Sequence, residues 1–208
     1  MQVQGQVGPQ VVADGAAASL RQDRQGSQVI TDAHGRYHEA SSRGRVFTAA
    51  NQAGKALTPF ATSSTTGFVL LNPTGSGVVL SILEIMFLQT STAAATASAF
   101  VALSASAPAA TAFTGQSGAL TVRNNSIGSA NAGSGLAYDT VTSKGTTDVL
   151  IRPIWQPSVS ATATTSIPPF IRDEVAGLIC VQPGSWVAMS ASSALSGITS
   201  MTWEEVPA

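Results

Sequence analysis

The sequence predicts an all-β protein, namely a jelly-roll-like antiparallel β-sandwich preceded by an extended N-terminal arm. From about residue 66 onward, short apolar segments alternate with Gly, Pro, Asn and Ser, which is the pattern of a sandwich or barrel. The chain is rich in Ala, Ser and Thr and holds 19 Gly and 10 Pro, and its many Ser, Thr, Gly and Pro residues disfavour long helices. A length of 208 residues suits one domain plus an arm.

The arm is predicted to cover residues 1–55, and the sandwich residues 56–208. The first 55 residues hold 10 charged residues and both histidines, and glutamines are frequent before residue 29. A polar segment with few large apolar residues cannot bury enough surface to offset its ordering entropy, so we expect the arm to order on a partner. Within it, the pattern predicts a short helix at 14–21 and extended chain at 35–39 and 43–47.

Nine short apolar segments are the candidate strands of the sandwich, and eight or nine strands suit a jelly roll. They are residues 68–71, 78–89, 100–103, 120–123, 136–142, 149–154, 177–181, 186–190 and 200–206. Turn-forming residues separate them at 72–77, 124–128, 144–145 and 182–184.

The segment 78–89 is the longest candidate strand, and strict alternation makes both of its faces apolar. One face would carry Val79, Leu83, Ile85 and Phe87, and the other Val78, Leu80, Ile82, Met86 and Leu88. An antiparallel strand usually turns one face to water. The arm or a neighbouring subunit would therefore cover the second face, or the strand would be central and covered within one chain. The sequence leaves these alternatives open.

Composition and charge argue against several classes of protein. A formal net charge of −1 with 10% charged residues removes the electrostatic attraction that nucleic acids and anionic membranes require, so neither is an expected partner. The apolar run 78–88 is too short to cross a bilayer as a helix. The N-terminus lacks the features of a secretory signal, and Cys180, the single cysteine, is interpreted as a small buried hydrophobe.

No motif for catalysis or cofactor binding is present, so we expect a protein that is not an enzyme and holds no cofactor. The Gly-x-Ser-x-Gly spacing is missing, and the Gly-rich segment 128–135 lacks the lysine of a phosphate-binding loop. The strongest metal candidate combines Asp32, His34, His38 and Glu39, but Gly35 would weaken a helix between the histidines. A solvated or interface segment is the better interpretation, and no metal site is predicted.

Acidic pairs and tryptophans also have simple structural explanations. The pairs at 173–174 and 204–205 would point to opposite faces of a strand, unlike the two facing carboxylates of a glycosidase. Trp155, Trp186 and Trp203 lie in strand-like runs, so core packing explains them better than carbohydrate binding.

Five residues of the arm are the candidate contacts to a partner protein. Arg36, Arg43 and Arg45 could pair with carboxylates of a partner, although a solvated basic patch explains them equally well. Tyr37 and Phe47, together with Val46, are the side chains that would anchor the arm.

Several short motifs resemble those of tailed-bacteriophage virion structural proteins. TDAHGRYHEA at 31–40 and RGRVFTAA at 43–50 resemble the N-terminal region of such proteins. LNPTGSG at 71–77, VQPGSW at 181–186 and TWEE at 202–205 look like jelly-roll cement or decoration proteins, which bind outside phage capsids.

The resemblance implies a structural role without catalysis, in which the protein stabilises a capsid by bridging its subunits. The implied partner is the major capsid protein of the same virion, and the sandwich would form dimers or trimers. The protein would be made in the bacterial cytoplasm and reside in the virion. The alternatives are a tail or neck protein or a receptor-binding module, and a cupin-like metalloenzyme would need histidines in the barrel.

Overall fold

The computed structural model describes residues 35–58, 64–90, 101–106, 114–143, 148–155, 170–192 and 195–208. The chain forms two compact units, Met1–Glu39 and Ala40–Ala208. Only residues 35–39 of the first unit are described, so the predicted helix at 14–21 lies outside the described residues.

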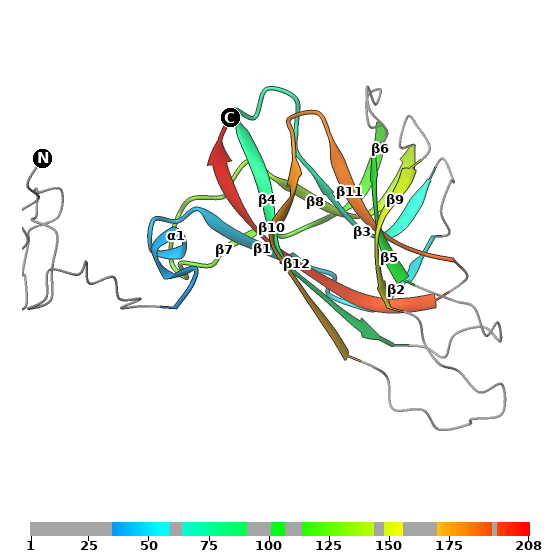
Figure 1. The fold of residues 1–208 in the computed structure, drawn as a ribbon. Helices are drawn as coiled ribbons and strands as arrows, with labels where there is room; N and C mark the ends of the chain where they lie inside the picture. The colour runs from blue at the N-terminus through cyan, green and yellow to red at the C-terminus, as the bar shows by residue number, and fades with distance from the viewer. Residues whose placement is uncertain are drawn as a thin grey trace, which may run out of the picture. The chain divides into compact units, whose positions relative to one another are not determined.

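The described chain contains one short helix and twelve strands (Figure 1). In chain order they are α1 (His38–Ser42), β1 (Val46–Ala50), β2 (Lys55–Leu57), β3 (Thr65–Leu71), β4 (Val78–Gln89), β5 (Val101–Ser106), β6 (Thr114–Leu120), β7 (Arg123–Asn124), β8 (Leu136–Ser143), β9 (Asp148–Trp155), β10 (Phe170–Val181), β11 (Trp186–Ala191) and β12 (Leu195–Pro207).

The strands form two antiparallel sheets that pack face to face as a sandwich (Figure 1). The first sheet has the order β10-β4-β12-β1-β7, with β2 also paired to β12, and the second has the order β6-β8-β3-β11-β5-β9. The chain crosses repeatedly between them, for example from β3 to β4 and from β11 to β12. The predicted fold class, a jelly-roll-like antiparallel β-sandwich, is confirmed for the described residues.

Large apolar side chains from both sheets fill the space between them. Phe47, Phe87 and Trp203 come from the first sheet and Phe68 from the second, and none is more than 1% exposed. Burying each such side chain stabilises the fold by about 1.5–3 kcal/mol. As the sequence predicts, Trp203 points into the core.

The second sheet is also covered on its other face. Trp186, Ala188, Val69 and Leu71 form a second buried cluster, whereas the residues that alternate with them face the sandwich core. All six residues of β11 are buried. Because the structure holds a single chain, a strand with two apolar faces can be covered here without a second subunit.

The predicted alternation of β4 is wrong after Ile82. Ile82 lies opposite Trp203 and Glu84 opposite Thr202, so Leu83 is an extra residue in β4 relative to β12. Such a β-bulge moves every later side chain to the other face. Leu80, Ile82, Ile85 and Phe87 therefore share the core, while Leu88 on the other face is 37% exposed.

The boundary between arm and sandwich moves from residue 55 to about residue 40. β1 pairs along its whole length with β12, and β2 extends that contact. The prediction of extended chain holds for Val46 and Phe47 in β1, but it is wrong at His38 and Glu39, which begin α1. The predicted strand at 120–123 is not one strand: its first residue ends β6 and its last begins β7.

The interpretation of Cys180 as a buried residue is wrong, because its side chain is exposed on β10. Exposed and partly buried residues alternate along this edge strand, and Cys180 belongs to the exposed set. The apolar neighbours Ile179 and Val181 face the core instead. An apolar run at a sheet edge does not need to be buried on both faces.

Candidate functional site

One end of the sandwich is held by polar contacts between three segments that are far apart in sequence. They are residues 44–46 before and in β1, the loop at 125–135 between β7 and β8, and the end of β12. The carbonyl of Gly44 accepts hydrogen bonds from the side-chain amides of Asn124, at 2.7 Å, and Asn131, at 3.0 Å. The backbone N–H of Asn125 donates to the carbonyl of Val46 at 2.8 Å. The loop is thus fastened to the start of β1.

Glu205 holds the far end of the 125–135 loop. Its carboxylate is buried at 8% exposure and accepts hydrogen bonds from the backbone N–H of Ser134, at 2.8 and 2.9 Å, and of Gly135, at 2.8 Å. The indole N–H of Trp203 lies 3.5 Å from the same carboxylate. A buried carboxylate needs such donors, because removing its water without replacing the hydrogen bonds costs several kcal/mol.

The loop is also ordered by contacts within itself. The backbone N–H of Ser126 donates to the Asn124 side chain at 2.8 Å, and that of Ser129 donates to the Ser126 carbonyl at 2.9 Å. Gly133 has a φ of 74°, and a Cβ there would lie 2.8 Å from the ring of Phe47, so this position requires glycine. The geometry fixes the loop at its ends and along its length, and exposes Ile127 to 89%.

Three of the five predicted partner contacts, Arg43, Arg45 and Phe47, belong to the unit Ala40–Ala208 and have different surroundings there. Arg45 forms an ion pair with Glu204 at 3.1 Å, and Arg43 is exposed. Phe47 is only 1% exposed, and its ring stacks on Trp203 with centroids 6.3 Å apart. Phe47 is therefore a core residue and not a contact to another protein. Its sequence context suggested an arm because polar residues surround it.

In the first unit, Arg36 and Tyr37 contact each other. The Arg36 guanidinium lies 5.4 Å from the centroid of the Tyr37 ring, a cation–π arrangement. His38 begins α1, whereas Asp32 and His34 lie outside the described residues.

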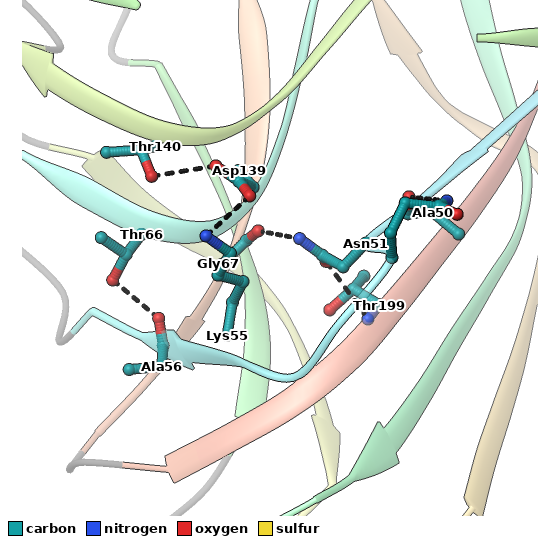
Figure 2. Close-up of polar contacts among 10 residues, drawn as sticks. Ala50, Asn51, Lys55, Ala56, Thr66, Gly67, Asp139, Thr140 and Thr199 are labelled. Atoms are coloured by element: carbon teal, nitrogen blue, oxygen red, sulfur yellow. Dashed lines mark hydrogen bonds and ion pairs between the residues drawn. The ribbon is translucent and has the colours of Figure 1, made fainter. Parts of the chain in front are cut away.

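A second polar cluster joins the two sheets near β2 (Figure 2). The side chain of Asn51 donates to the carbonyl of Gly67 at 2.6 Å and accepts from the backbone N–H of Thr199 at 3.3 Å. The Lys55 ammonium pairs with the Asp139 carboxylate at 2.9 Å. Asn51 and Lys55 each connect strands of different sheets. Sequence reasoning missed both residues, because neither lies in a recognisable motif, and their role here is structural.

The side of the sandwich at β9 and β10 exposes apolar side chains. Val149, Leu150 and Ile151 follow one another on the edge strand β9 and are 50%, 39% and 42% exposed, and Phe170 at the start of β10 is 62% exposed. We call these four residues the edge patch. Val149 and Leu150 are consecutive residues in regular register with β5, so their side chains point to opposite sides of β9, and the edge patch spans both sides of this edge strand. Exposed apolar side chains at a sheet edge are a common feature of protein contact surfaces.

A paired arginine joins the two edge strands. Arg152 of β9 makes a bidentate contact with Asp173 of β10, with N–O distances of 2.7 and 2.9 Å. The hydrogen bonds that Arg152 donates to the Asp173 carboxylate raise the pKa of the Arg152 side chain above its ordinary value, against the opposing effect of burial. The guanidinium therefore stays charged at every pH at which the protein would be studied.

Within the residues that the structure describes, no three His, Cys, Asp or Glu side chains come together as a metal site. No described helix is long and apolar enough to cross a membrane. Comparison with protein-family models, with curated proteins and with solved structures finds no match to this chain. The fold and the surface contacts define a β-sandwich with an anchored loop and an apolar edge patch.

Proposed function

We propose that this chain is a non-enzymatic virion structural protein that binds the outside of a phage capsid and stabilises it by bridging capsid subunits. The resemblance of its short motifs to cement and decoration proteins suggests a location on the outer surface of a phage capsid. The observation that carries the proposal is the edge patch, because it offers a surface for association with protein and not for chemistry.

The composition of the edge patch suits a protein–protein contact. Three of its members are consecutive aliphatic residues with 39–50% exposure, and the charged pair of Arg152 and Asp173 lies beside them. Interface centres are enriched in aromatic residues, methionine and arginine and depleted in lysine, glutamate and aspartate, and Phe170 and Arg152 fit this composition. The patch would pair copies of the sandwich into the proposed dimer or trimer, or bring it against the major capsid protein.

Capsid stabilisation would follow from many modest contacts. A stable interface buries about 800 Å² on each partner, and repeated contacts over one shell add through multivalency. Each bridging protein would then oppose separation of its neighbouring subunits. The N-terminal segment before residue 40 would extend the reach of the sandwich, which matches its polar, Gln-rich composition.

The direct test is co-sedimentation with particles of the encoding phage that were assembled without this protein. Full-length protein should bind with saturable stoichiometry, and a deletion of residues 1–39 should weaken binding. The deletion ends at residue 39 because β1 is part of the sandwich, so a longer deletion would remove the core residue Phe47. A thermal melt of the deletion variant must show a folded sandwich.

The edge patch is tested with the double substitution Val149→Ser and Ile151→Ser. It should weaken particle binding or self-association, whereas Leu136→Ser, at 41% exposure on β8, should not. If full-length protein does not bind particles, the capsid assignment fails, and binding to tails or to host cells becomes the next test.

A further inference from the structure

Ile127 stands at the most exposed point of a loop whose conformation is fixed. It is 89% exposed, more than any other large apolar side chain that the described residues contain. A single exposed aliphatic residue is ordinary on a protein surface. The loop around Ile127 is not ordinary, because two asparagines and a buried carboxylate hold it.

The anchors act on both sides of Ile127. Before it, the Asn124 side chain binds the Gly44 carbonyl and the Ser126 backbone N–H. After it, the Asn131 side chain binds the same carbonyl, and Glu205 binds the end of the loop. A loop that is already fixed loses little conformational entropy when it binds. The loop therefore holds its conformation without a partner.

We propose that the 125–135 loop inserts Ile127 into an apolar pocket of the shell protein to which this chain binds. This inference rests on the proposed function, and it names one contact through which the chain would bind the shell protein. The role extends beyond the edge patch, because the loop belongs to the connection between β7 and β8, not to β9 or β10.

The position of the loop favours the shell protein over a second copy of this chain. The loop is fastened to Gly44 and Val46, and the N-terminal segment joins the sandwich at residue 40. The proposed function assigns that segment to the shell. The loop is bonded to Gly44, four residues along the chain from Ala40, so contacts made by the loop and by the chain before Ala40 would be linked. Linked contacts bind more tightly than either alone.

The test compares Ile127→Ser with wild-type protein in co-sedimentation with particles of the encoding phage that lack this protein. We expect about 10- to 100-fold weaker binding, which corresponds to burial of one isoleucine side chain. The matched control is Leu178→Ser on β10, because Leu178 is also highly exposed, at 77%, and lies outside the loop. Both variants should melt at the wild-type temperature.

A second variant tests the fixed conformation. Glu205→Gln leaves Ile127 in place but weakens the anchor at Ser134 and Gly135, so particle binding should fall by a smaller factor, about 3- to 10-fold. Binding by Glu205→Gln equal to wild type would overturn the role of the anchor.

The outcomes separate the inference from the proposed function. If wild-type protein binds particles and Ile127→Ser binds equally well, the inference is overturned and the proposed function stands. If Ile127→Ser changes the association state of the protein without particles, as measured by sedimentation velocity, the loop joins copies of this chain and the inference is overturned. If wild-type protein does not bind particles, both fail.

Discussion

Replacing Glu205 by alanine should destabilise the fold far more than replacing its neighbour Glu204. The two carboxylates are adjacent in β12 and point to opposite faces of the sheet. Glu205 is 8% exposed and anchors the loop, whereas Glu204 faces outward and pairs with Arg45. The pair of variants therefore removes the same side chain from two different surroundings.

The expected magnitude follows from the hydrogen bonds that each change removes. Glu205→Ala leaves the backbone N–H groups of Ser134 and Gly135 without the carboxylate. A hydrogen bond to a charged group contributes about 1.5–3 kcal/mol, but the freed loop can turn these groups to water. We expect a loss of about 2–3 kcal/mol in the free energy of unfolding. Glu204→Ala should cost less than about 1 kcal/mol, because the Arg45 side chain is 40% exposed and water screens the pair.

Urea unfolding followed by circular dichroism measures both changes, and hydrogen exchange locates them. In Glu205→Ala the backbone N–H groups of Ser134 and Gly135 should exchange roughly 30- to 150-fold faster, the equivalent of the lost free energy. Equal stability losses in the two variants would refute the anchoring role, as would unchanged exchange at these two positions.

Substitutions at three further positions test the packing, the backbone and an ion pair. Phe47→Ala should lower the free energy of unfolding by about 3–5 kcal/mol in urea unfolding, because it opens a cavity beside Trp203; a loss below about 1 kcal/mol would place β1 outside the core. Ala176→Gly should raise the melting temperature by a few degrees, about 1 kcal/mol in stability, because Ala176 has a φ of 55°, and Ala176→Val should lower it; the opposite order would contradict this backbone conformation. Asp173→Asn should cost less than about 1 kcal/mol, and the cost should shrink at high salt, since Asp173 and Arg152 are partly exposed; a cost that does not depend on salt would argue against an ionic contribution.

The class of fold could be predicted from the sequence because the spacing of apolar runs and turn residues is a local signal. Eight of the nine predicted segments overlap one strand over most of their length, and the segment 78–89 coincides with β4. The predicted segment 120–123 covers only the last residue of β6 and the first of β7. The sequence does not predict the rest of β6, because TGQSGAL contains one large apolar residue. The pairing of a polar strand depends on its neighbours, which local composition does not reveal.

The limits of the arm were harder to predict, because Phe47 and Val46 stand among charged and polar residues. Burial of these two side chains depends on β12, more than 150 residues further along the chain. The anchored loop is similar: its Gly, Ser and Asn residues predict only a loop. Glu205 fixes this loop by accepting a hydrogen bond from Ser134, which lies 71 residues before it in the sequence. Nothing in the local sequence around Glu205 predicts this contact.

The β-bulge at Leu83 determines which side chains of β4 face the core and which face outward. Leu83 is the extra residue of β4 relative to β12, and it also faces the irregular stretch of β10 between Glu174 and Ile179. Two register shifts in neighbouring strands thus coincide. Because a shift of one residue exchanges the faces of a strand, β4 can place Ile82 and Ile85 in the same core.

The same irregularity shapes the outer surface. The four residues of β10 that lie opposite Leu83 include Ala176, in a left-handed conformation, and Leu178, which is 77% exposed. The backbone strain at Ala176 costs about 1–2 kcal/mol and is tolerated because the strands on either side of the bulge stay paired. The inner packing of the sandwich and the apolar side chains that it exposes at β10 therefore have one structural cause, and a substitution that removed the bulge would change both together.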